Sequence, residues 1–95
     1  MSDEVYTRII HYDPDKNIQV RVGINVFREV EYLFVRKYYE DFNGEWKPSN
    51  EGVNIPLTLD NSKELFAGLV EILSLAESKD IIIAHFKELI EDTYQ

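Results

Sequence analysis

The stretch Ile18-Gln19-Val20-Arg21-Val22-Gly23-Ile24-Asn25-Val26 decides the fold. Apolar and polar side chains alternate along it at every position. A period of two is typical of a β-strand that buries one face, because successive side chains point to opposite sides of a sheet. The polar side chains occupy every second position from Gln19, and the next position in this series is Phe27. The sequence therefore predicts a strand over residues 18–26, with an aromatic ring at the end of its polar face.

Strand signals lie on both sides of this stretch. Residues 5–12 are rich in β-branched and aromatic side chains, and residues 13–17 carry turn chemistry throughout. Residues 30–39 form a second long β pattern in which both faces are bulky. Because aromatic side chains on strands usually pack inside a protein, we expect three rings of this strand to be buried: Tyr32, Phe34 and Tyr38.

A further hairpin is expected after the second long strand. Asn43-Gly44 between β-rich flanks predicts a type I′ turn, which needs positive φ at both central residues. Residues 47–52 read as a loop, and residues 53–59 as a last strand. Pro56 confines that strand to an edge or a bulge, because proline cannot donate to a sheet ladder.

The period changes after residue 60. Asn61, with Glu64 three positions later, is typical of a helix N-cap, and a broad apolar stripe follows over residues 61–77. Ser78-Lys79-Asp80 predicts a break, and residues 81–92 a second helix. Either a partner chain or this second helix could cover the broad stripe. Strands first and helices last predict an α+β fold, with helices packed on one side of an antiparallel sheet.

Composition narrows the class of protein. The chain has 95 residues and a net charge of −8, without cysteine. Residues 16–47 are nearly neutral, with six basic and five acidic side chains, and the rest of the chain is strongly acidic. The acidic start and the lack of a long apolar run predict a soluble intracellular protein with no membrane segment. A chain this short buries only about 60–65% of its unfolded surface, so burial of further surface in a dimer interface would stabilise it.

The residues offer little support for catalysis or for a cofactor. His11, Asp13 and Asp15 begin like a calcium loop, but Ile18 and Ile24 stand where that loop needs glycine and glutamate. We therefore expect a plain turn, no metal and no enzyme. A magnesium nuclease is a weak alternative that would draw on acidic residues of the strands: Glu29, Glu31, Glu40 and Asp41.

Aromatic and basic residues alternate along the predicted strands. Phe27 adjoins Arg28, a basic pair precedes two tyrosines at 36–39, and Trp46 adjoins Lys47. Single-stranded nucleic acid needs cations for its backbone and flat rings for its unpaired bases. Because the chain is acidic, stacking has to supply much of the affinity. The pattern therefore indicates a surface for single-stranded nucleic acid, although rings on strands more often belong to a core.

The stretch Val35-Arg36-Lys37-Tyr38-Tyr39-Glu40-Asp41-Phe42-Asn43-Gly44-Glu45-Trp46-Lys47-Pro48, followed by Gly52-Val53, resembles the transcriptional coactivator family named for positive cofactor four. The resemblance covers about residues 19–77. It implies a strongly curved antiparallel sheet of four to five strands followed by one or two helices. It divides a single domain, 1–95, into an N-terminal extension (1–17), a coactivator-like core (18–77) and a C-terminal helical extension (78–95).

The resemblance also implies a homodimer that grips single-stranded DNA, including strands of a melted duplex. Dimerisation through the helices would use Phe66, Leu69, Val70 and Leu73. Phe27 and Tyr39 match the positions of stacking aromatics. Phosphate contacts are expected from basic residues of the strands and turns: Arg21, Arg28, Arg36, Lys37 and Lys47. Five such contacts predict a slope of about −3.5 for log K against log salt.

Departures from the family pattern bear on affinity. Ser49, Asn50 and Glu51 replace a glycine and a basic pair, and Asn25 and Val30 replace basic residues. The resemblance therefore implies DNA binding in a nucleoid or a nucleus. This binding would depend more on stacking, and less on salt concentration, than that of the basic relatives. It implies a role in transcription regulation, DNA replication or recombination. The alternative is a protein-interaction module that has lost most DNA affinity and binds a partner on its acidic helical face.

Overall fold

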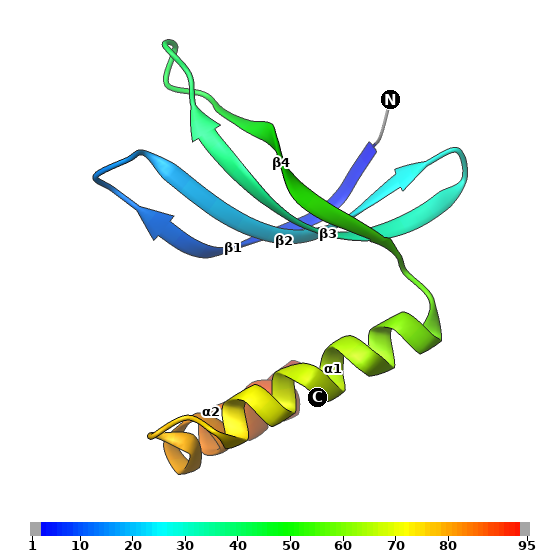
Figure 1. Cartoon of the computed structure of the whole chain (residues 1–95), viewed down its shortest axis with the longest axis vertical. Coiled ribbons are helices and arrows are strands. Elements are labelled where there is room, and N and C mark those ends of the chain that lie inside the picture. Colours follow the sequence, from blue (N-terminus) through cyan, green and yellow to red (C-terminus); the bar gives the residue numbers. More distant parts are fainter. Residues whose placement is uncertain (1–2, 94–95) are drawn as a thin grey trace. The chain divides into compact units, whose positions relative to one another are not determined.

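The computed structural model describes residues 3–93 as four strands followed by two helices. The strands are β1 (Asp3–Asp13), β2 (Ile18–Phe27), β3 (Val30–Glu40) and β4 (Trp46–Pro56), and the helices are α1 (Leu59–Ser74) and α2 (Lys79–Thr93). The strands form one antiparallel sheet in the order β1-β2-β3-β4 (Figure 1). The α+β class is confirmed, with four strands and two helices. The chain forms two compact units, a sheet unit that ends at Thr58 and a helical unit that begins at Leu59.

The sheet is strongly bent along its strands (Figure 1). The hydroxyl of Tyr38 donates to a carboxylate oxygen of Glu4 at 2.8 Å. On β2, the partners of these two residues are Gln19 and Asn25, which would lie about 20 Å apart along a flat strand. The bend brings these two side chains within hydrogen-bonding distance over one face, which is therefore the concave face.

The polar side of β2 forms this concave face. Gly23 lies opposite Phe34, and a Cβ at position 23 would come within 2.6 Å of the Phe34 ring and 2.2 Å of the Tyr6 carbonyl oxygen. Glycine is thus required where the ring crosses the strand. Phe34 and Tyr38 are 2% and 4% exposed, which confirms their expected burial, whereas Tyr32 is only half-buried. The alternating valines and isoleucines of β2 form the opposite, convex face.

The type I′ turn lies at another hairpin than the one predicted. The I′ geometry occurs at Arg28-Glu29, with φ of 53° and 67°, and not at Asn43-Gly44. Between β3 and β4, the Gly44 N–H donates to the Asp41 carbonyl, and only Gly44 takes a positive φ there. The longer loop relieves Asn43 of the left-handed conformation, whereas the two-residue link of β2 to β3 imposes it on both residues.

The predicted loop over residues 47–52 is wrong, because this segment belongs to β4. Lys47 pairs with Tyr39 and Gly52 pairs with Arg36, and the register shifts between these pairs. Three residues, 49–51, therefore oppose Lys37 in a bulge. Pairing with a long neighbouring strand outweighs the local preference of proline and glycine for turns. Pro56 lies on an edge strand, as predicted.

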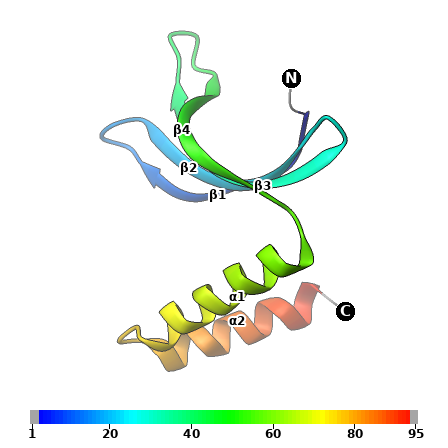
Figure 2. The same cartoon turned by 45° about the vertical axis from the view of Figure 1, so that its right-hand side comes forward.

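The helical unit contains both predicted helices with shifted ends. α1 begins at Leu59, so Asn61 lies within its first turn and the predicted cap is wrong; Thr58 holds the preceding position. α1 stops at Ser74 because the N–H groups of Leu75 and Ala76 bond three residues back, which tightens the last turn. α2 then runs beside α1 (Figure 2), and the rings of Phe66 and Phe86 lie 6.1 Å apart.

Candidate nucleic-acid interface

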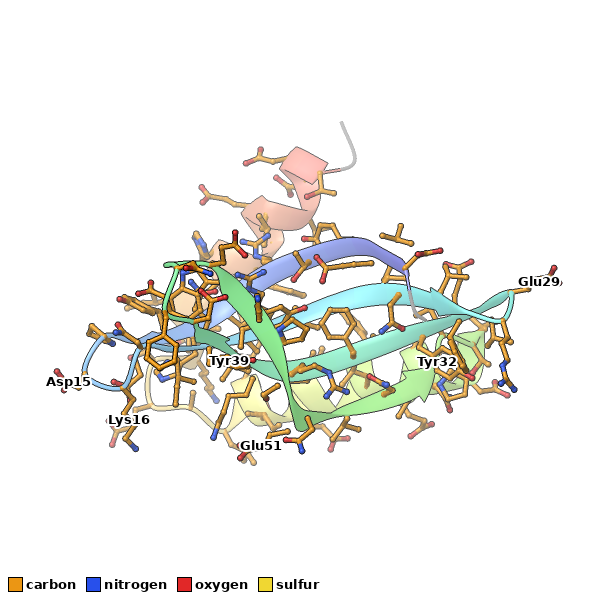
Figure 3. The ribbon with its side chains drawn as sticks, turned by 90° about the horizontal axis from the view of Figure 1, so that it is seen from above. Asp15, Lys16, Glu29, Tyr32, Tyr39 and Glu51 are labelled. Carbon is orange, nitrogen blue, oxygen red and sulfur yellow. The ribbon has the colours of Figure 1, made fainter. Side chains whose placement is uncertain are left out.

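The concave face contains a small hollow lined by all four strands. Its volume is about 150 Å³, and its walls are Glu4, Asn25, Phe34, Arg36, Tyr38 and Pro48. The Asn25 side-chain oxygen is buried there without a hydrogen-bond partner within residues 3–93. Figure 3 looks onto this face, with Glu29 at one end of the sheet and Asp15 and Lys16 at the other.

Arg21 and Arg36 lie directly opposite each other on this face. Nε and Nη2 of Arg21 donate to Oε1 of Gln19 at 2.9 and 2.7 Å. Nη1 of Arg36 donates to the Ser49 carbonyl at 2.9 Å, and its Nη2 donates to Oδ1 of Asn54 at 3.1 Å. All these acceptors are neutral, and neither arginine makes an ion pair with any residue from 3 to 93. Two positive charges therefore share the face without a carboxylate partner.

An aromatic ring and a glycine position these arginines. The Arg21 guanidinium carbon lies 4.1 Å from the centre of the Tyr38 ring, a cation–π contact. Burial, together with the hydrogen bond to Glu4, raises the pKa of Tyr38 to about 12. Tyr38 is therefore a neutral donor at physiological pH. Glycine at position 52 leaves room for Arg36, whose guanidinium carbon would lie 2.8 Å from a Cβ there.

Phe27 ends the same face, because it pairs with Val30 at the last rung of β2 and β3. Its ring is 37% exposed, and the Arg28 guanidinium carbon lies 5.1 Å from the ring centre. Arg28 itself stands in the β2–β3 turn. The structure thus brings together four of the predicted DNA-binding residues on the concave face or at its end: Arg21, Phe27, Arg28 and Arg36.

The other three predicted residues lie on the convex face. Lys37 and Tyr39 alternate with Arg36 and Tyr38 along β3, and Lys47 pairs with Tyr39. The side chains of all three therefore point away from the arginines. Tyr39 is 45% exposed. The seven predicted residues therefore do not form one patch, because a strand sends neighbouring side chains to opposite faces.

Both lysines of the convex face are ion-paired. Lys37 Nζ lies 2.7 Å from Oε2 of Glu51, and Lys47 Nζ lies 2.9 Å from Oδ2 of Asp41. The hydrogen bond from Lys37 lowers the pKa of Glu51, and that from Lys47 lowers the pKa of Asp41. The same pairing raises the pKa of Lys47. These cations are already neutralised within the chain, unlike the arginines.

Ser49 is a site residue that the sequence pattern did not predict. Its hydroxyl donates to the Lys37 carbonyl at 2.7 Å and accepts from the Glu51 N–H at 3.1 Å, which holds the bulge. The carbonyl oxygen of Ser49 accepts a hydrogen bond from Nη1 of Arg36. Gln19 and Glu4 were also missed. Only Gln19 carried a usable signal, because alternation places it on the face of Arg21.

The four residues predicted for a dimer interface lie on α1. Phe66 contacts Phe86 of α2, which covers part of the apolar stripe within the chain, yet Phe66 remains 52% exposed. Leu69 and Val70 are exposed, and Leu73 is half-buried. Within residues 3–93, no helix is long and apolar enough to cross a membrane. In the same range, no three histidine, aspartate or glutamate side chains cluster as metal ligands would.

Known proteins are similar to this chain in sequence and in architecture. A family model described as Transcriptional Coactivator p15 (PC4) matches residues 15–67. A solved structure from bacteriophage T5 has a TM-score of 0.75 and 30% sequence identity, over 92% of this chain and 96% of that chain. It is a homolog of the eukaryotic transcription coactivator PC4, implicated in recombination-dependent DNA replication. No curated protein matches. The four-stranded curved sheet, the helices after it and these matches together show that the chain belongs to the PC4 family of transcriptional coactivators.

Proposed function

We propose that this protein is a single-stranded-DNA-binding homodimer, and a binding module rather than an enzyme. The phosphate backbone lies along the concave face against Arg21 and Arg36, and unpaired bases stack on Phe27 beside Arg28. Membership of the PC4 family supports a DNA-binding role. The T5 homolog, implicated in recombination-dependent DNA replication, favours work on replication or recombination intermediates, with transcription regulation as the family's other role. Such binding places the protein with DNA in the cell.

The observation that carries this proposal is the pair of arginines, Arg21 and Arg36, which have no carboxylate partner among residues 3–93. Two like charges opposite each other on neighbouring strands destabilise a sheet by roughly 0.2–1 kcal/mol. Their guanidinium groups are oriented by neutral oxygens, which leaves the positive charge available to a ligand. Arginine binds phosphate through paired hydrogen bonds that add geometric specificity as well as energy. Stacking tolerates any base, so binding is independent of sequence.

The ion pairs of Lys37 and Lys47 change the expected salt dependence. If only the three arginines release counterions, the slope of log K against log salt is about −2, and if the lysines also release theirs it is about −3.5. We expect the shallower value. Tyr39, Lys37 and Lys47 then form a secondary contact surface on the convex face, which is engaged only where phosphate displaces the carboxylates.

The exposed apolar side chains of α1 support a homodimer. In residues 3–93 only Phe34 and Tyr38 are fully buried apolar side chains, whereas Phe66, Leu69 and Val70 are exposed. A second copy covering α1 would remove this surface from water at about 25 cal/mol per Å². Leu69→Glu should therefore yield a monomer in sedimentation, while Ile81→Glu on α2 should not.

The decisive experiment is a binding titration by fluorescence anisotropy with a single-stranded oligo-dT and a duplex of equal length, at two salt concentrations. We expect tighter binding of the single strand. Phe27→Ala should weaken it about ten-fold or more, and Ile81→Ala, which removes an exposed apolar group from α2, should not change it. No binding of the wild-type protein to the single strand at low salt would rule the proposal out.

That last result would favour a protein-interaction module. The segment from residue 59 to 95 carries eight acidic and three basic side chains, and both convex-face lysines are neutralised. A basic protein partner on the acidic helices is the occupant this charge favours. Its signature would be a salt-sensitive complex lost on replacing Glu88 and Glu91 with lysine.

A further inference from the structure

Two buried side-chain oxygens of the concave face have no hydrogen-bond partner within residues 3–93. They are Oδ1 of Asn25 and Oγ1 of Thr7, and the pairs Glu4–Asn25 and Thr7–Gly23 place both residues on this face. About 90% or more of the buried polar groups in proteins are hydrogen-bonded, because an unpaired group has lost its hydration without replacement. A ligand that donates a hydrogen bond on this face would therefore be stabilised.

Asn25 shares its hollow with the carboxylate of Glu4. The two residues pair across β1 and β2, and both line the hollow of the concave face. Oε2 of Glu4 accepts the hydroxyl of Tyr38 at 2.8 Å, and Oε1 makes no hydrogen bond or ion pair with any residue from 3 to 93. The hollow thus offers two acceptors, the amide oxygen of Asn25 and Oε1 of Glu4. A group with two N–H donors matches them.

The size of the hollow limits which base of a DNA strand can enter it. Its volume is about 150 Å³, and Phe34 and Pro48 supply apolar walls. A cavity of about this volume holds one six-membered aromatic ring, so a single-ringed base fits and the fused rings of a purine do not. The two single-ringed bases differ in their polar groups, because cytosine carries the amino donor N4–H₂ where thymine carries the acceptor O4.

We propose that this hollow selects cytosine at one position of the bound strand, with Asn25 and Glu4 accepting hydrogen bonds from the amino group of the base. Thymine would instead bring its O4 oxygen towards the same two acceptors, which repel it. The inference rests on the proposed single-strand binding, and it adds a preference at one position to a surface that otherwise tolerates any base. Arg36 lines the same hollow and is the phosphate contact proposed above, so the strand passes beside the opening.

Strands of deoxycytidine and deoxyuridine test the proposal. Uracil and cytosine differ only at position 4 and the adjoining N3, and neither carries the methyl group of thymine. Fluorescence anisotropy titrations compare oligo-dC with oligo-dU of equal length near neutral pH. We expect the wild-type protein to bind oligo-dC about five-fold or more tightly, as hydrogen bonds to a buried amide and a carboxylate predict. Equal affinities for the two strands would overturn the proposal.

Replacing Asn25 locates the preference. Asn25→Leu keeps a side chain of similar size without an acceptor, so its ratio of affinities for oligo-dC and oligo-dU should fall towards one. Asn43→Leu is the matched control, because the side chain of Asn43 is exposed in the β3–β4 turn, and it should keep the wild-type ratio. Each ratio compares two strands on one protein, so a general loss of affinity cancels. A wild-type ratio in Asn25→Leu would count against the hollow.

Glu4→Gln provides a second variant with a distinctive signature. It removes a negative charge from the concave face, so both strands should bind more tightly. Glutamine keeps an oxygen for Tyr38 and places an N–H₂ group at the other acceptor, so the preference for oligo-dC should nevertheless shrink. Glu88→Gln makes the same change of charge on α2 and corrects for it. Tighter binding of both strands with an unchanged ratio would show that Glu4 acts through its charge alone, contrary to the proposal.

The outcomes separate this inference from the proposed function. If the wild type binds oligo-dC and oligo-dU equally while Phe27→Ala weakens its binding of both, the hollow does not select a base and the proposed function stands. If the wild type binds neither strand at low salt, both fail.

Discussion

Arg21 of β2 lies directly opposite Arg36 of β3, and each guanidinium is held by neutral oxygens. We expect Arg21→Gln and Arg36→Gln each to weaken binding of oligo-dT and to flatten the salt slope by about 0.7. Lys87→Gln on α2 removes the same charge far from the sheet in sequence and is the control. Anisotropy titrations at four salt concentrations measure the slope. A slope equal to that of the wild type in both arginine variants would show that neither residue contacts phosphate.

Glu51 competes with DNA for Lys37. Glu51→Gln should release the lysine, so single-strand affinity should rise and the salt slope should steepen by about 0.7. Thermal stability should hardly change, because the ion pair is exposed. Glu88→Gln makes the same charge change on α2 and corrects for the gain in net charge. Equal affinities of the two variants would mean that Lys37 stays away from the strand.

Gly23 is required by the Phe34 ring that lies over it. Gly23→Ala should lower the free energy of unfolding by about 1–3 kcal/mol, because the added methyl meets the ring and the Tyr6 carbonyl. Gly68→Ala in α1 is the matched control: nothing lies within 4 Å of a Cβ there. This change should stabilise the protein by about 0.5–1 kcal/mol. Urea unfolding followed by circular dichroism measures both, and a Gly23→Ala variant as stable as the wild type would contradict the packing.

The β2–β3 turn holds two non-glycine residues at positive φ. Glu29→Gly should raise the free energy of unfolding by about 1 kcal/mol, since glycine adopts this conformation without steric cost. Glu31→Gly, two residues further on and within β3, should instead destabilise by about 0.5–1 kcal/mol. Urea unfolding measures both variants. A midpoint for Glu29→Gly that is not above that for Glu31→Gly would contradict the prediction. Arg28 is unchanged in both, so DNA affinity should persist.

The Asp41–Lys47 pair predicts a dependence of stability on acid pH. Hydrogen bonding from Lys47 holds the pKa of Asp41 below its ordinary value of 3.8. The ionised carboxylate therefore stabilises the folded state fully above that value, and this contribution is lost as the pH falls through the lowered pKa. Asp41→Asn keeps an oxygen for the two turn N–H groups but cannot titrate. Its melting temperature should fall less than that of the wild type between about pH 5 and about pH 3; parallel curves would contradict the prediction.

The sequence alone determined the elements that depend on local period. Alternation over residues 18–26 predicted β2 and the face on which Phe27 lies, and the later apolar stripe predicted α1. These follow from the repeat of each backbone, because side chains two apart on a strand share a face. The resemblance over residues 35–53 added the family and the bend of the sheet.

Only the tertiary structure decided what each basic side chain meets. Lys37 and Lys47 are neutralised by Glu51 and Asp41, whereas Arg21 and Arg36 make no ion pair in the part of the chain that the structure describes. The bulge at 49–51 that delivers Glu51 to Lys37 depends on the pairing of β4 with β3. Such contacts join residues far apart in the chain through strand register, and register belongs to the assembled sheet. The local pattern therefore predicted which strands carry the basic and aromatic residues. The pairing of the strands decided which of the basic side chains are neutralised by a carboxylate.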